Sequence, residues 1–116
     1  MGAGTLNLAI EQGVTWEYTI AVTGLDLTGA SAAMQVRWKP NAPTTLLELS
    51  TDPTNGRITL TVTDEDNAQL LLALTAVETA ALTWGVAPYD LELTLASGDV
   101  VRLLQGNVTI WPEVTR

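Results

Sequence analysis

Two runs of alternating apolar and polar residues make up Tyr89-Asp-Leu-Glu-Leu-Thr-Leu-Ala-Ser-Gly-Asp-Val-Val-Arg-Leu-Leu104, a stretch that continues as Gln105-Gly-Asn-Val-Thr-Ile110. In the first run the tyrosine and the leucines fall on one face of an extended strand, while the acidic residues and the threonine fall on the other. The Ser97-Gly-Asp99 segment between the runs favours a tight turn. The pattern therefore predicts an antiparallel β-hairpin with one packed and one solvent-facing side.

Similar alternation recurs upstream, with turn-forming residues between the runs. It predicts strands over residues 6–11, 14–22, 32–39, 44–50 and 58–63. Gln12-Gly13 is typical of a turn or bulge and predicts that the first two of these strands pair with each other. A β-bulge is predicted at Gln105-Gly106, because the apolar residues change phase between Leu103 and Val108.

The segment over residues 64–82 carries mixed signals. Its acidic start, Asp64-Glu-Asp66, suits a helix N-terminus, a solvated turn or a weak cation site. Three leucines at every second position then alternate like a strand, and Thr75-x-x-Glu78 matches a capping box. We expect a turn over residues 64–67, a strand over 68–74 and one short helix over 76–82.

Short strands at regular intervals, joined by turns and accompanied by one small helix, are typical of a two-sheet sandwich. We therefore expect an all-β protein with an immunoglobulin-like antiparallel β-sandwich and one short helix near residues 76–82. No linker or internal repeat divides the sequence, so residues 1–116 are expected to form a single domain. Trp16 and Trp38 fall on the apolar phase of their strands, which predicts that both lie in the core.

The chain contains neither cysteine nor histidine. Disulfides, thiolate metal ligands and thiol nucleophiles are thereby excluded, together with the most common general base. Asp90 and Glu92 project from the same face of one strand, as a catalytic carboxylate pair would, but Arg102 on the partner strand offers them a cross-strand ion pair. We expect the ion pair, and we expect a protein that is not an enzyme and uses no cofactor or metal.

Thirteen acidic and five basic residues give the chain a net charge of −8. That charge repels nucleic-acid phosphates and anionic membranes, so neither is expected as a partner. The sequence has no apolar segment long enough to span a membrane and no signal-peptide pattern at its start, which predicts synthesis and folding in a cytoplasm.

Hydrophobic residues make up 47% of the chain, and the mean hydropathy is +0.22. For a small acidic protein this excess predicts that some apolar surface faces a partner, although small residues lining both sheet faces would also account for it. Trp84, beside a glycine, and Trp111, before a proline, are the candidate contact residues, with Glu113 and Arg116 as polar contacts. Exposed indoles would equally suit stacking on sugars.

Several blocks of the sequence resemble a family of small virion structural proteins encoded by bacteriophages and prophages. The blocks are Leu6–Trp16, Leu25–Gly29, Met34–Arg37, Glu78–Trp84, Tyr89–Leu93, Ser97–Asp99, Arg102–Gly106 and Pro112–Arg116. They span nearly the whole chain, and the closing Pro-Glu-Val-Thr-Arg is the most specific of them. Their order is also similar to that in the amino-terminal immunoglobulin-like domain of phage baseplate upper proteins.

The resemblance implies a β-sandwich that is attached to a capsid, tail or baseplate through oligomeric contacts, and it defines no catalytic residue. We therefore expect a non-enzymatic virion structural protein, made in the host cytoplasm, that forms homo-oligomers and binds other virion proteins. It would act as a head decoration or cement protein, or as a tail or baseplate adaptor. The alternative is a carbohydrate-binding module of a tail structure that recognises the host surface.

Overall fold

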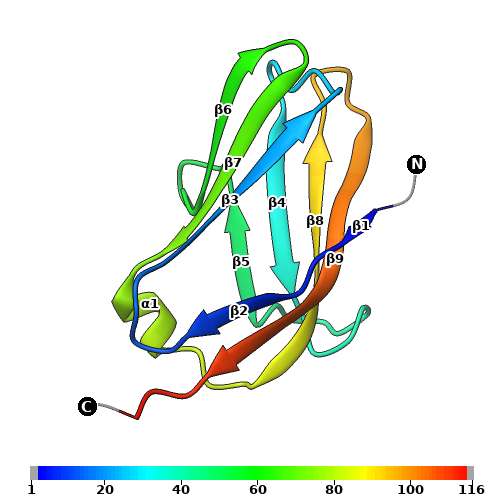
Figure 1. The fold of residues 1–116 in the computed structure, drawn as a ribbon. Helices are drawn as coiled ribbons and strands as arrows, with labels where there is room; N and C mark the ends of the chain where they lie inside the picture. Colours follow the sequence, from blue (N-terminus) through cyan, green and yellow to red (C-terminus); the bar gives the residue numbers. More distant parts are fainter. Residues whose placement is uncertain (1–2, 115–116) are drawn as a thin grey trace.

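The computed structural model describes residues 3–114, which form two facing β-sheets with one short helix at one end (Figure 1). In the larger sheet the strand order is β1-β9-β8-β4-β5, with β2 also paired to β9, and in the smaller sheet it is β3-β7-β6. The larger sheet contains β1 (Gly4–Thr5), β2 (Leu8–Glu11), β4 (Ser31–Val36), β5 (Leu47–Ser50), β8 (Val86–Thr94) and β9 (Val100–Trp111). The smaller sheet contains β3 (Trp16–Thr23), β6 (Ile58–Asp64) and β7 (Asn67–Leu74). The predicted two-sheet sandwich is therefore confirmed.

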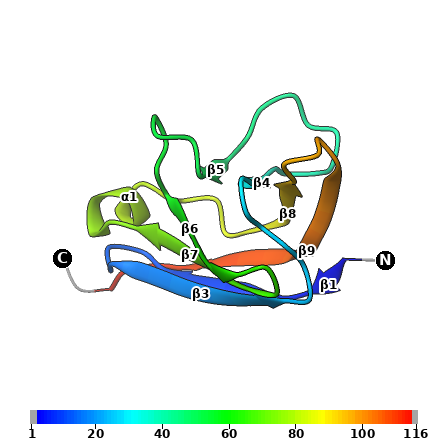
Figure 2. The ribbon, with the colours of Figure 1, turned by 90° about the horizontal axis from the view of Figure 1, so that it is seen from above.

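The core lies between the two sheets and is built from the apolar phase of each strand. Seen from above, the larger sheet curves from β5 through β4 and β8 to β9 and β1, and so wraps around one side of the smaller sheet (Figure 2). Burying this apolar surface stabilises the fold by roughly 25 cal/mol for each Å² removed from water. The largest fully buried apolar side chains are Ile10, Leu27, Met34, Val36, Leu49, Leu70, Leu72, Leu74, Leu91, Leu93 and Val108.

The predicted hairpin is formed by β8 and β9, with the alternation that the sequence indicates: Leu91 and Leu93 are buried, and Asp90 and Glu92 face outward. The β-bulge lies elsewhere than predicted. Leu91 pairs with Leu104 but Glu92 pairs with Arg102, so the extra residue is Leu103 and not Gln105-Gly106. Because the bulge advances the pleat by one residue, two consecutive leucines are both half-buried.

The predicted hairpin between residues 6–11 and 14–22 is wrong. β2 pairs in parallel with β9, placing Leu8 beside Val108 and Ile10 beside Ile110, whereas β3 pairs with β7 in the other sheet. The segment between β2 and β3 therefore crosses from one sheet to the other instead of turning back. Gln12 holds this crossing, because its side-chain amide donates to the carbonyl oxygen of Leu82 (3.0 Å) and accepts from the backbone N–H of Glu113 (3.0 Å).

A tyrosine hydroxyl fixes the start of the chain against the last strand. The Tyr89 side chain is buried, and its hydroxyl donates a hydrogen bond of 2.7 Å to the carbonyl oxygen of Leu6, between β1 and β2. Tyr89 pairs with Gly106 on β9, and a Cβ at Gly106 would overlap that same Leu6 carbonyl group. Burial raises the pKa of Tyr89 to about 12, so the donating proton is retained well into alkaline solution.

The short helix α1 (Ala76–Ala80) begins at the predicted capping box and ends two residues before the predicted end. The Thr75 hydroxyl accepts from the N–H of Glu78 (3.2 Å), and the Glu78 carboxylate accepts from the N–H of Thr75 (2.8 Å) and from Arg57. The hydrogen bond from the Thr75 backbone, with the Arg57 guanidinium beside it, holds the pKa of Glu78 below its usual range. The helix is tied to the β2–β3 crossing by Thr79, whose buried hydroxyl donates to the carbonyl oxygen of Val14 (2.9 Å).

The predicted turn between β6 and β7 is present, although it consists of Glu65 and Asp66 only, because Asp64 ends β6 and Asn67 begins β7. The Asp64 carboxylate accepts hydrogen bonds from the N–H of Asp66 (2.8 Å) and from the side chain of Asn67 (2.9 Å). These bonds, the Asp66 backbone bond first, lower the pKa of Asp64. The acidic run therefore caps a turn. Within residues 3–114, no group of three or more acidic side chains is placed to hold a metal ion.

The prediction that Trp38 lies in the core is wrong, because 57% of its surface is exposed. β4 ends at Val36, two residues before the tryptophan, so the alternation of the strand no longer decides which way the side chain points. The Arg37 side chain donates to the carbonyl oxygen of Ala42 (2.7 Å) and holds this segment as a loop that leads past two prolines to β5. The expected strand at residues 44–50 accordingly begins only at Leu47.

Across the described part of the chain, no helix has the length and apolar character needed to cross a membrane.

Replacing Gly106 with Ala is expected to lower the free energy of unfolding by about 2–3 kcal/mol, since the added methyl group must displace the Leu6 backbone. Urea unfolding measures the effect, and amide hydrogen exchange is expected to rise in β1 and β2. Gly4→Ala is the matched control, because its methyl group would meet the flexible end of the Leu104 side chain at 3.2 Å and the Leu103 carbonyl oxygen at an ordinary contact distance of 3.7 Å. Equal effects of the two substitutions would contradict this role of Gly106.

Replacing Glu78 with Gln is expected to cost about 1 kcal/mol of stability at neutral pH, because the ionised carboxylate caps α1 and pairs with Arg57. The pKa of Glu78 is depressed in the folded state, so this stabilisation is present above its ordinary pKa of 4.5 and is lost as the pH falls through the folded value. Urea unfolding at neutral and acidic pH should show a difference that shrinks in acid. Glu65→Gln, in an exposed turn, should show little difference at either pH.

Candidate functional site

A recess at one corner of the sandwich, which we call the edge hollow, lies where β2, the start of β3 and the end of β9 meet. Its volume is about 390 Å³, and it is lined by Ala9, Glu11, Val14, Thr15, Trp16 and Trp111. The parallel pairing of β2 with β9 sets Glu11 beside Trp111, and the crossing to the other sheet brings Val14 and Trp16 to the opposite wall. Three separate segments of the chain therefore build the recess.

The walls of the edge hollow are mainly apolar and partly open to solvent. Trp111 is 58% exposed and Val14 is 47% exposed, while Trp16 is half-buried against the core. The Trp16 ring stacks on the Tyr18 ring, with 6.5 Å between centroids and 22° between ring planes, so its orientation is fixed by packing. This surface accounts for part of the apolar excess in the composition, and a rigid, incompletely covered aromatic surface is suited to contact with another molecule.

The predicted contact residues divide between this site and other positions. Trp111 lines the edge hollow. Glu113 lies beside it, because its backbone N–H is held by Gln12 and its carboxylate lies where a Cβ on Gly13 would be. Trp84 is half-buried against the core, and its indole N–H is buried without an acceptor among the described residues. Arg116 lies outside the described residues.

Sequence reasoning missed Val14 and Trp16 as site residues. Both fall on the apolar phase of the strand predicted over residues 14–22, which indicates a core position when a strand is covered by a full opposing sheet, but β3 begins only at Trp16. Trp16 begins an edge strand, where the opposing sheet covers it only in part. The signal that identifies the site is tertiary, because it depends on β2 joining β9 and leaving this corner open.

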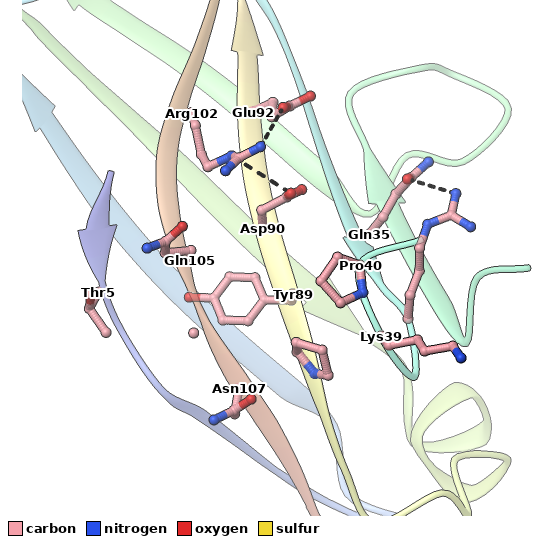
Figure 3. A pocket seen from close by; sticks show the side chains of 13 residues that line it. Thr5, Gln35, Lys39, Pro40, Tyr89, Asp90, Glu92, Arg102, Gln105 and Asn107 are labelled. Atoms are coloured by element: carbon pink, nitrogen blue, oxygen red, sulfur yellow. Dashed lines mark hydrogen bonds and ion pairs between the residues drawn. The ribbon is translucent and has the colours of Figure 1, made fainter. Parts of the chain in front are cut away.

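A second recess, which we call the outer hollow, lies on the solvent-facing side of the larger sheet and has a volume of about 520 Å³ (Figure 3). Arg102 on β9 reaches Asp90 (3.7 Å) and Glu92 (3.9 Å) on β8, which confirms the predicted cross-strand ion pair. Both carboxylates therefore share one guanidinium group, and all three side chains are about half exposed. The arrangement ties two strands together at the surface, where such pairs contribute little stability.

Comparison with known proteins identifies the fold but no family. No protein-family model matches the chain, and no curated protein matches it. Among solved structures, 445 chains match, including a crystal structure of a chicken T-cell receptor (TCR) with a TM-score of 0.52 and 16% identity. That match covers 96% of this chain, which spans 56% of the length of the receptor chain. The β-sandwich is thus immunoglobulin-like, as predicted, and a fold shared so widely selects no function by itself.

The two candidate tryptophans are expected to differ sharply in their contribution to folding. Trp84→Ala should lower the free energy of unfolding by about 2–3 kcal/mol, because it empties space against the core. Trp111→Ala should cost less than about 1 kcal/mol, because more than half of the side chain is already in water. Chemical denaturation of the two variants measures both values. A loss at Trp111 as large as that at Trp84 would show that Trp111 serves the fold and not the surface.

Proposed function

We propose that this chain is a non-enzymatic phage virion structural protein that binds other virion proteins, as a head decoration or cement protein or as a tail or baseplate adaptor module. In this proposal it is made in the host cytoplasm and then becomes part of the particle. The observation that carries the proposal is the edge hollow, an open apolar recess around Trp111 on a rigid β-sandwich. The class of partner rests on the resemblance of blocks such as Pro112–Arg116 to phage structural proteins.

The edge hollow suits the capture of an apolar side chain from a partner protein. Trp111 and Val14 offer exposed apolar surface, and Trp16 supplies a wall whose ring is already held by stacking on Tyr18. Aromatic side chains that are rigid before binding lose little conformational entropy when a partner arrives. Such residues carry most of the binding energy in many interfaces, particularly when they lie around one central anchor.

Negative charge around the edge hollow indicates which kind of partner surface would fit it. Glu11 lines the edge hollow, Glu113 follows Trp111 by two residues, and the chain as a whole carries a net charge of −8. A partner with lysine or arginine side chains around the inserted apolar group would match this rim, whereas an acidic partner would be repelled. The proposal therefore specifies an apolar anchor with basic neighbours.

The remaining polar surface favours a role without catalysis. The chain has no histidine or cysteine, and the carboxylate pair Asp90 and Glu92 shares the guanidinium group of Arg102. Two carboxylates held by one cation on an open sheet face serve strand pairing more readily than proton transfer.

Incorporation into particles tests the proposal. Phage carrying Trp111→Ala should contain far fewer copies of the chain per major capsid protein than wild-type phage, as measured by quantitative mass spectrometry of purified virions. Trp38→Ala is the matched control, because it removes an equally exposed tryptophan outside the edge hollow and should leave the copy number unchanged. A wild-type copy number near parity with the capsid protein would indicate head decoration, and a small one a connector, tail or baseplate position.

Two results would overturn the proposal. Absence of the wild-type chain from purified virions would exclude a structural role in the particle. Equal incorporation of the Trp111 and Trp38 variants would exclude the edge hollow as the contact surface.

One observation favours a second candidate function, that of a host-surface carbohydrate-binding module. Trp111 and Trp38 both expose more than half of their surface, and open indole faces stack on sugar rings. On this alternative, host polysaccharide would quench or blue-shift the tryptophan emission of the isolated protein, and the change would be lost in whichever tryptophan variant removes the stacking face.

A further inference from the structure

β3 differs from the other outer strands of the described sandwich because it combines length and uninterrupted pairing with a single charged residue. Proteins protect sheet edges by keeping them short, interrupting them with bulges or placing charges and prolines on them. β5 has four residues, and the opposite edge of that sheet is divided between the short strands β1 and β2. β6 carries a register shift between Val62 and Asp64.

β3, by contrast, is long, regular and nearly uncharged. It pairs with β7 without interruption over all eight residues from Trp16 to Thr23, and it contains no proline or glycine. Glu17 is its only charged residue. Figure 1 shows β7 along one side of β3 and no further strand of the same sheet along the other. A regular open edge of this length is a template for another strand.

The inner face of β3 also lacks part of its cover. Tyr18 is 37% exposed and Ile20 is half-buried, although both fall on the phase that faces the core. The inner residues of the neighbouring strand, Leu70 and Leu72 on β7, are completely buried. The incomplete burial of these inner side chains is therefore confined to the open side of β3. A strand added there would supply the missing contacts.

We propose that a second copy of this chain pairs with β3 in antiparallel orientation around a two-fold axis at Thr19. Opposed residues in an antiparallel pair point to the same face, so inner residues must meet inner residues if the two cores are to be continuous. A two-fold axis at Thr19 satisfies this condition and joins the two small sheets into one six-stranded sheet. The opposed pairs are then Thr19 with Thr19, Tyr18 with Ile20, Glu17 with Ala21, and Trp16 with Val22.

This register is self-complementary, which is why a second copy is the occupant. Aromatic residues meet β-branched residues and threonine meets threonine, all of which are stabilising cross-strand pairs. Glu17 faces Ala21, so no like charges are opposed although each copy carries a net charge of −8. Because the contact uses the same edge on both copies and the other edges are short or bulged, the assembly closes as a dimer.

The inference deepens the proposed function by naming a copy-to-copy contact of the structural protein, and it rests on that function only in assuming that the chain works through contacts with other chains. It uses the edge of β3, whose first residue Trp16 also lines the edge hollow, and it leaves Trp111 free for a different partner. A purified protein that does not dimerise would overturn the β3 contact without deciding the incorporation test. The two proposals can therefore fail separately.

Cysteine cross-linking tests the register directly, because the natural chain has no cysteine. Residues opposed across the axis lie about 4.5–5.5 Å apart between Cα atoms, within the range that a disulfide spans. Thr19→Cys is therefore expected to form a covalent dimer rapidly under mild oxidation. Ala21→Cys, on the same exposed face of the same strand, should not, since two such residues lie about 13 Å apart in this register. Thr61→Cys on β6 controls for chance collisions.

Sedimentation of the cysteine-free protein gives the second measurement. The natural chain is expected at twice its monomer mass of 12.3 kDa. Thr19→Lys should convert it to a folded monomer, checked by circular dichroism, because two lysines would then oppose each other at the axis. Thr61→Lys should stay dimeric. A monomeric natural chain, or cross-linking at Thr19 no faster than at Thr61, would overturn the proposal, and the first result would leave β3 open for a strand of a different protein.

Discussion

The hydroxyl group of Tyr89 donates to the carbonyl oxygen of Leu6, and it reaches that oxygen because Gly106 carries no side chain at the point where the chains cross. This contact fixes β1 and β2 in parallel against β9, at the edge of the larger sheet. Once β2 is held there, the chain must cross to the other sheet to begin β3. Both the open corner that forms the edge hollow and the unprotected edge of β3 follow from that crossing.

Features governed by neighbouring residues could be predicted from the sequence. The β8–β9 hairpin, the acidic turn before Asn67 and the capping box of Thr75 and Glu78 are encoded within a few residues, and all are present. The pairing of β2 could not be predicted, because its partner lies a hundred residues away and Gln12-Gly13 resembles a local turn. The bulge was misplaced for a related reason: Gly106 is required by the Leu6 backbone and not by the pleat of its own strand.

The candidate site shows the same division. The exposure of Trp111 could be predicted, because the residue ends a strand directly before Pro112. Trp16 and Trp38 could not be placed, because alternation says which face a residue is on but not whether an opposing sheet covers that face. Trp38 follows the end of β4, and Trp16 begins an edge strand, so the local pattern overstated the burial of both.

The parallel pairing of β2 with β9 also dictates the order in which the chain acquires its structure. Leu8 cannot pair with Val108, its neighbour in the sheet, until all of the intervening sequence has been synthesised. The pair of β6 with β7 and the pair of β4 with β5 need only nearby residues and can assemble earlier. On the ribosome, β2 thus emerges well before β9, and during that interval its apolar side chains lack the strand beside which they are buried in the folded protein.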